Sequence, residues 1–150
     1  MEELIELLKE SAEVYKQFLE LEYKKYDIVI KNDVISLDDI VSKEQVVFLK
    51  MRGLEQKREK LIVSFGMNGK TFKEIIDNQD EDENLLSEYQ NLKSIISEVK
   101  KISSLCKTLI EVRLHRLDKA MSQLGESENT YTNKEIKNGS AKSLIISKKI

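Results

Sequence analysis

Side chains that could carry out catalysis are few in this sequence and poorly grouped. The single histidine, His115, stands in the segment VRLHRLDK, with no cysteine, serine or second histidine at a spacing that would form a nucleophilic or metal site. Carboxylates are abundant but are interleaved with lysines at helical spacing, as in Glu6 with Glu10 and Glu55 with Glu59, which is typical of solvated helix faces. We therefore predict neither an enzyme nor a cofactor or metal site, and we expect His115 on a helix surface or in a groove.

A second candidate for chemistry is the segment GMNGKT, from Gly66 to Thr71. It is similar to the end of a phosphate-binding loop, which needs a glycine, four residues and then Gly-Lys-Ser/Thr. Ser64 stands where the first glycine should be, and the residues before it have a helical pattern rather than that of a buried strand. We therefore interpret the segment as a turn and not as a nucleotide site.

The composition of the 150-residue chain is that of long helices joined by few turns. Charged residues make up 35% of it and aromatic residues 6%, tryptophan and proline are absent, and there are only five glycines. The length suits one folded body. The formal net charge of -2 excludes an electrostatic field strong enough to hold nucleic acid by neutralising phosphates, for which a basic stripe would be expected. We expect one all-α domain without a nucleic-acid partner.

The cysteine content and the first residues of the chain indicate the cellular compartment of the protein. One cysteine, Cys106, excludes an intramolecular disulfide and fits a reducing compartment, where we expect it as a small buried residue on a helix. The N-terminus opens directly into an amphipathic pattern rather than a secretory signal, and no apolar run approaches the roughly 18 residues of a membrane span. The prediction is a cytoplasmic protein with no direct membrane insertion.

Apolar residues at three and four spacing predict three long helices, and a capping box predicts one short helix. These cover about residues 2–31, 36–65, 72–77 and 83–124. Since the first two long helices, of about 30 residues each, are shorter than the third, they would leave roughly three of its turns uncovered. We predict an elongated antiparallel three-helix bundle or coiled coil over residues 1–125. A flexible basic tail, with five lysines against three glutamates, would follow over residues 126–150.

Local signals predict where these helices begin and end. Ser36 with Asp39 resembles a capping box at the start of the second long helix, with aspartate in place of glutamate. Thr71 with Glu74 forms a capping box that opens the short helix. Gly125 is in the usual position of a glycine that ends a helix, and we expect the third long helix to stop there.

The order of these elements over nearly the whole chain resembles the FlgN family of flagellar export chaperones. The resemblance rests on the polar break after a long first helix, the KEQ segment with Lys43 and Glu44, LEQKR from Leu54 to Arg58, Gly66 after the second helix, the Thr71 capping box before a short helix, a long last helix, and TYTNKE from Thr130 to Glu135. It implies a chaperone without enzymatic activity or a cofactor.

The resemblance also implies partners and binding residues. Proteins of this family hold the hook-filament junction proteins FlgK and FlgL through the C-terminal part of the chaperone and then dock on the export gate protein FlhA. We expect client binding by apolar residues late in the last helix and in the tail. These are Leu109, Val112, Leu114, Leu117, Met121, Leu124, Ile136, Leu144, Ile145 and Ile146. Tyr131, by likeness, would contact FlhA.

Two alternatives remain open at this point. Each apolar residue late in the last helix could instead pack within the bundle or in a homodimer. The tail, through Ile136 and the run from Leu144 to Ile146, could shield the vacant groove or fold over the bound client, or it could have no role. The whole chain could also be a structural coiled-coil adaptor or a dimerisation module. That alternative predicts a constitutive oligomer whose apolar stripe is covered by the protein itself.

Overall fold

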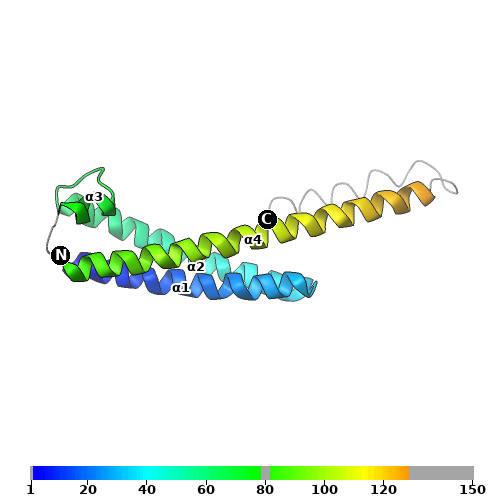
Figure 1. Ribbon diagram of the computed structural model, residues 1–150, viewed down its shortest axis with the longest axis horizontal. Helices are drawn as coiled ribbons and strands as arrows, with labels where there is room; N and C mark the ends of the chain where they lie inside the picture. The colour runs from blue at the N-terminus through cyan, green and yellow to red at the C-terminus, as the bar shows by residue number, and fades with distance from the viewer. Residues whose placement is uncertain (1, 79–81, 129–150) are drawn as a thin grey trace. The chain divides into compact units, whose positions relative to one another are not determined.

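The computed structural model describes residues 2–78 and 82–128 of the chain, and the side chains among these as far as Gly125. These residues form four helices and no strand, so the predicted all-α bundle is confirmed (Figure 1). The helices are α1 (Glu2–Ile30), α2 (Val34–Ser64), α3 (Phe72–Asp77) and α4 (Glu83–Glu128). The chain divides into two compact units, one up to Leu109 and one from Ile110, and each is described by itself.

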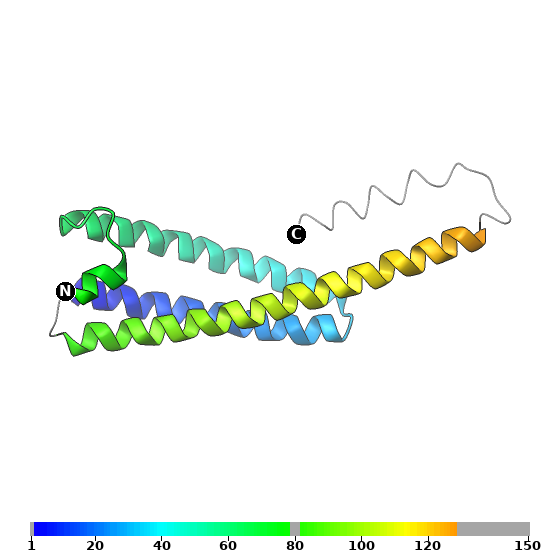
Figure 2. The ribbon, with the colours of Figure 1, turned by 45° about the horizontal axis from the view of Figure 1, so that its top comes forward.

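The unit up to Leu109 is a three-helix bundle. α1 and α2 form an antiparallel hairpin, and the first part of α4 runs beside it in the same direction as α1 (Figures 1 and 2). Ion pairs link both neighbours to α1: Lys57 on α2 lies 2.9 Å from Glu10, and Lys9 lies 3.9 Å from Glu88 on α4. Because these pairs are largely exposed, they mark the register of the helices and add little to stability.

The core of this unit is built from the apolar stripes that the sequence predicts. α3 contributes two buried residues, Ile75 and Ile76, and so covers one end of the bundle, as Figure 2 shows. The buried side chains of the main cluster are Leu4, Leu7, Leu8, Ala12, Val14, Phe18, Val47, Leu54, Ile62, Ile75, Ile76, Leu85, Leu92, Ile95 and Val99. Their burial, at about 1.5–3 kcal/mol for each large side chain, holds the helices together.

One of the two predicted capping boxes is confirmed and the other is wrong. Thr71 Oγ1 accepts from the backbone N–H of Glu74, and the Glu74 carboxylate accepts from the backbone N–H of Thr71 at 2.7 Å. At α2, the cap is Asp33 and not Ser36. The Asp33 carboxylate accepts from the Ser36 backbone N–H at 3.1 Å, so the helix begins at Val34. Asp33 is the N-cap because it directly precedes the helix, where its side chain can reach the unpaired backbone N–H groups of the first turn.

The prediction that Gly125 ends the last helix is also wrong. α4 continues to Glu128, three residues further. The two described glycines with positive φ are Gly66 and Gly69, in the turn between α2 and α3, and Gly125 does not share their left-handed conformation. A glycine with helical dihedral angles is tolerated inside a helix at a cost of about 1 kcal/mol relative to alanine.

Candidate functional site

Burial along α4 stops at Cys106. The preceding turns contain the buried residues Leu92, Val99 and Ile102, whereas no residue in the range 107–125 is buried. Of the six residues of α4 that the sequence singles out for partner binding, four are exposed and two are half-buried, Leu109 and Leu114. The exposed residues are Val112 (43%), Leu117 (51%), Met121 (41%) and Leu124 (65%).

Five apolar residues of α4 share one face of the helix after Leu109. Their spacings are four, three, four and three residues, which keeps them within about 80° around the helix axis. They are Ile110, Leu114, Leu117, Met121 and Leu124, and we call them the α4 apolar face. Leu109 lies beside this face, about 80° from Leu117, whereas Val112 lies about 140° from Leu117 and therefore points elsewhere.

The remaining predicted binding residues lie outside the described residues. These are Tyr131, assigned to gate docking, and the tail residues Ile136, Leu144, Ile145 and Ile146. Their roles stay predictions.

A groove of about 840 Å³ opens in the unit up to Leu109, between α1, α2, α3 and α4. Half-buried apolar side chains line it, among them Tyr15, Tyr89 and Ile96. Two of its lining residues contact each other, since the guanidinium carbon of Arg58 lies 5.6 Å from the centre of the Phe72 ring. The rest of its lining is polar or charged and includes Glu55, Glu59 and Lys73.

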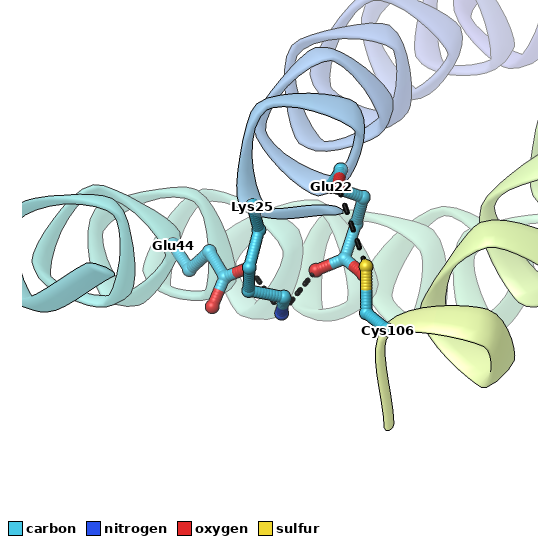
Figure 3. Close-up of polar contacts among 4 residues, drawn as sticks. All are labelled: Glu22, Lys25, Glu44 and Cys106. Atoms are coloured by element: carbon cyan, nitrogen blue, oxygen red, sulfur yellow. Dashed lines mark hydrogen bonds and ion pairs between the residues drawn. The ribbon is translucent and has the colours of Figure 1, made fainter. Parts of the chain in front are cut away.

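A buried polar cluster joins α1, α2 and α4 in the same unit (Figure 3). Lys25 Nζ donates to Glu22 Oε1 and to Glu44 Oε1, each at 2.6 Å. Cys106 Sγ donates to the backbone oxygen of Glu22 at 3.4 Å. The side chains of Glu22 and Glu44 are 1% and 8% exposed, so two carboxyl groups and one ammonium group share a site with little water.

The pKa values of the two carboxyl groups in this cluster are shifted in opposite directions. Burial raises the pKa of Glu44 to about 7, and the adjacent Glu22 adds to the rise. Burial acts on Glu22 in the same direction, but the contacts with Glu44 and with the Lys25 ammonium outweigh it and hold the pKa of Glu22 below its ordinary value. With Glu44 protonated the cluster carries no net charge, and with Glu44 ionised it carries one buried negative charge.

Cys106 belongs to the packing of the cluster and not to a reactive site. It is 1% exposed, and burial raises the pKa of its thiol to about 11. The thiolate, which is the nucleophilic form, is therefore scarce at neutral pH. The expectation that Cys106 is a small buried residue on a helix is confirmed.

A family model described as FlgN protein matches residues 1–138. The chain belongs to the FlgN family. The chain matches no curated protein and no solved structure.

FlgN membership assigns the chain to the flagellar export chaperones, a family that binds flagellar hook-associated proteins. The matched range contains the whole α4 apolar face together with Tyr131 and Ile136, and it ends before the apolar run from Leu144 to Ile146. The resemblance drawn from the order of helices and turns is therefore confirmed.

His115 is exposed on α4, and no group of three metal-ligating side chains comes together in the described residues. No helix in the described part of the chain is long and apolar enough to cross a membrane.

Sequence reasoning missed the polar cluster and one member of the α4 apolar face. Glu22 occupies a core position of α1, seven residues from the buried Val29, and Glu44 lies between the buried Ile40 and Val47 of α2. A glutamate at a core position was the signal that could have indicated burial. Ile110 has the same spacing as its neighbours on the α4 apolar face and could have been included by helical phase alone.

Proposed function

We propose that this chain is a cytoplasmic chaperone that holds the C-terminal helical segments of FlgK and FlgL on the α4 apolar face and delivers them to the export gate protein FlhA. The observation that supports this best is the α4 apolar face itself. Three of its five members, Leu117, Met121 and Leu124, are more than two fifths exposed, although they keep the spacing of a helix contact.

The chemistry of the α4 apolar face suits an amphipathic helix. Such a helix places its own apolar residues at three and four spacing and can pack along the face over roughly four turns. Burying one large apolar side chain contributes about 1.5–3 kcal/mol, so a few such contacts can offset the cost of association. Met121, with its unbranched and polarisable side chain, can adapt to two different client helices.

The C-terminal tail, residues 126–150, also takes part in client binding in this proposal. Ile136 and the run from Leu144 to Ile146 fold over the bound client and pay their ordering entropy only then. Hydrogen exchange of the tail amides tests this part: protection should appear only with client, and equal exchange with and without client contradicts it.

Tyr131 contacts FlhA once the client is loaded. Tyr131→Ala should weaken docking on FlhA and leave client affinity intact, as measured by binding assays with each partner. Loss of client binding instead would place Tyr131 in the client site.

A pair of substitutions on α4 tests the binding face. Met121→Asp introduces a charge into the α4 apolar face and should weaken binding of FlgK or FlgL segments about 10- to 100-fold. Val112→Asp changes a residue of nearly equal exposure, 43% against 41%, on another side of the helix, and should change affinity less than about twofold. Titration calorimetry with the full-length protein measures both, and binding should saturate at one chaperone per client.

Two results would contradict this assignment. Equal losses in Met121→Asp and Val112→Asp would mean that the helix does not bind through the α4 apolar face. No binding of either client by the unsubstituted protein, together with a stable self-associated state, would favour the structural adaptor.

A further inference from the structure

The buried polar cluster lies where the burial of α4 ends. Cys106 is the last buried residue of α4 among those described, and its thiol donates to the backbone oxygen of Glu22 on α1 at 3.4 Å. Figure 3 shows Lys25 between the carboxyl groups of Glu22 and Glu44, with Cys106 against Glu22. A change of charge in the cluster therefore acts on the helical turn of α4 around Cys106.

Of the three long helices, α4 is the least firmly attached at this point. The backbones of α1 and α2 run closer to each other than to α4. At this end of the hairpin a turn joins them, in which the Asp33 backbone N–H donates to the Ile28 oxygen at 3.2 Å. The chain connects α4 to the rest of the bundle at its other end, Glu83. The ion pair of Lys9 with Glu88 lies about five turns before Cys106 on α4, so it does not hold this part of the helix.

The cluster contains one ammonium group for two carboxyl groups. Lys25 Nζ lies 2.6 Å from Glu22 Oε1 and from Glu44 Oε1, while Glu22 Oε2 is buried and accepts no hydrogen bond from the described residues. The titratable groups that act on Glu44 are Glu22 and Lys25 of α1. Burial raises the pKa of the Cys106 thiol on α4 to about 11, so that group stays neutral. A second carboxylate would have no counter-ion, and water would have to reach it to offset the cost of its burial.

We propose that the buried polar cluster is a proton-dependent latch, which holds the turn of α4 around Cys106 on the α1–α2 hairpin while Glu44 is protonated and releases that turn when Glu44 ionises. In the released state α1 and α2 stay paired, and water reaches the two carboxylates. Release also exposes Ile102 and Cys106, which are 6% and 1% exposed in the held state. The latch involves no client and does not depend on the proposed function.

The pH range of release follows from the environment of Glu44 in the two states. The pKa of Glu44 is about 7 in the held state, against an ordinary value of 4.5. Because the raised pKa belongs to the held state, that state is favoured at low pH and loses its advantage as the pH rises through 7. Between pH 6 and pH 8 the ratio of released to held protein should therefore rise about tenfold.

Labelling of Cys106 measures the release. Cys106 is the one cysteine of the chain, so a thiol reagent added to the full-length protein reports on this position alone. Dividing the labelling rate in the folded protein by the rate in urea at the same pH removes the effect of thiol ionisation. This labelling ratio should rise about tenfold from pH 6 to pH 8 in the original protein and less than about twofold in Glu44→Gln. Glu55→Gln, which removes an exposed carboxyl group of α2, should keep the full rise.

Glu22→Gln tests the balance of charges in the cluster. With residue 22 uncharged, Lys25 becomes the counter-ion of Glu44, so Glu44 ionises below pH 6 without leaving a net charge. The labelling ratio of this variant should change less than about twofold between pH 6 and pH 8. A rise in Glu22→Gln as large as in the original protein would show that the charge of the cluster does not control the release, and it would overturn the proposal.

The urea dependence of labelling separates release of one turn from unfolding of the whole chain. Release exposes little surface, so the labelling ratio at pH 8 should change little in dilute urea. It should also exceed the unfolded fraction extrapolated from urea unfolding by at least about tenfold. A labelling ratio equal to the unfolded fraction would mean that the reagent reaches Cys106 only through global unfolding. That result, or a labelling ratio in the original protein that does not change with pH, overturns the proposal.

Discussion

Replacing Glu44 with glutamine should change how the stability of the bundle depends on pH. In the folded chain the pKa of Glu44 is about 7, against an ordinary value of 4.5. A carboxyl group whose pKa is raised by folding gives its full stability below the unfolded value and loses it as the pH rises through the folded value. For Glu44 this loss extends from about pH 4.5 to above pH 7. At about 1.36 kcal/mol for each pH unit between the two values, it amounts to about 3 kcal/mol.

Glutamine resembles the protonated carboxyl group and cannot ionise. Its amide oxygen can still accept from Lys25, so the variant should match the original protein near pH 5. As the pH rises to 8, Glu44→Gln should become progressively the more stable, by up to about 3 kcal/mol, because the original protein then carries an unneutralised buried charge. Urea unfolding followed by circular dichroism at pH 5, 6, 7 and 8 measures the difference directly.

The other shifted groups do not interfere in this range. The pKa of Glu22 lies below its ordinary value, so its contribution is complete above about pH 4.5 and is lost only as the pH falls. The pKa of Cys106 rises from 9.0 to about 11, so its contribution is lost only above about pH 9.

Glu55→Gln is the matched control. Hydrogen bonding to Arg58 lowers the pKa of Glu55, so its ionisation is complete by about pH 5 and this variant should differ from the original protein by a constant amount between pH 5 and 8. A constant difference for Glu44→Gln as well, or one that shrinks as the pH rises, would refute the argument that Glu44 holds a proton in the buried cluster.

Three further predictions concern helix ends and packing. Thr71→Ala removes the capping hydroxyl of α3 and should lower the free energy of unfolding by about 1 kcal/mol. Ile75→Ala leaves a cavity at a fully buried position and should lower it by about 2–4 kcal/mol. Urea unfolding measures both values, and equal losses would mean that α3 does not cover the core. Cys106 should react with a thiol reagent at least about a hundredfold more slowly in the folded protein than in urea, and equal rates would show that α4 does not bury it. Gly125→Ala should raise the helical signal slightly, since Gly125 lies inside α4, and a loss of helix would contradict that placement.

The fold was predictable because its signals are local. The Thr71 capping box, which indicated the short helix, and the glycine turn before it depend on residues a few positions apart, and apolar spacing indicated the three long helices. The error at Ser36 arose because several polar residues in succession could cap α2, and only the backbone geometry shows that Asp33 precedes the helix. Gly125 fits both a helix end and a helix interior, and sequence alone does not distinguish them.

The candidate site was harder to predict because it depends on contacts distant in sequence. Glu22 and Lys25 have the spacing of an ordinary solvated ion pair, and what makes them different is Glu44, which lies on another helix. The residues of the α4 apolar face are equally suited by type to a core, and their exposure depends on where burial along α4 ends. Val112 shows the limit of judging by residue type, since it is apolar and exposed but lies away from the face.

Hydrogen exchange along α4 tests the central claim most directly. The full-length protein would be labelled with and without a C-terminal helical segment of FlgK or FlgL and analysed by mass spectrometry. The account predicts that client binding slows exchange in residues 110–124, because the client helix covers the α4 apolar face and suppresses local opening there. Unchanged exchange in residues 110–124, with new protection around the groove residues Tyr15, Tyr89 and Ile96 instead, would contradict it and move the client to the groove between the helices.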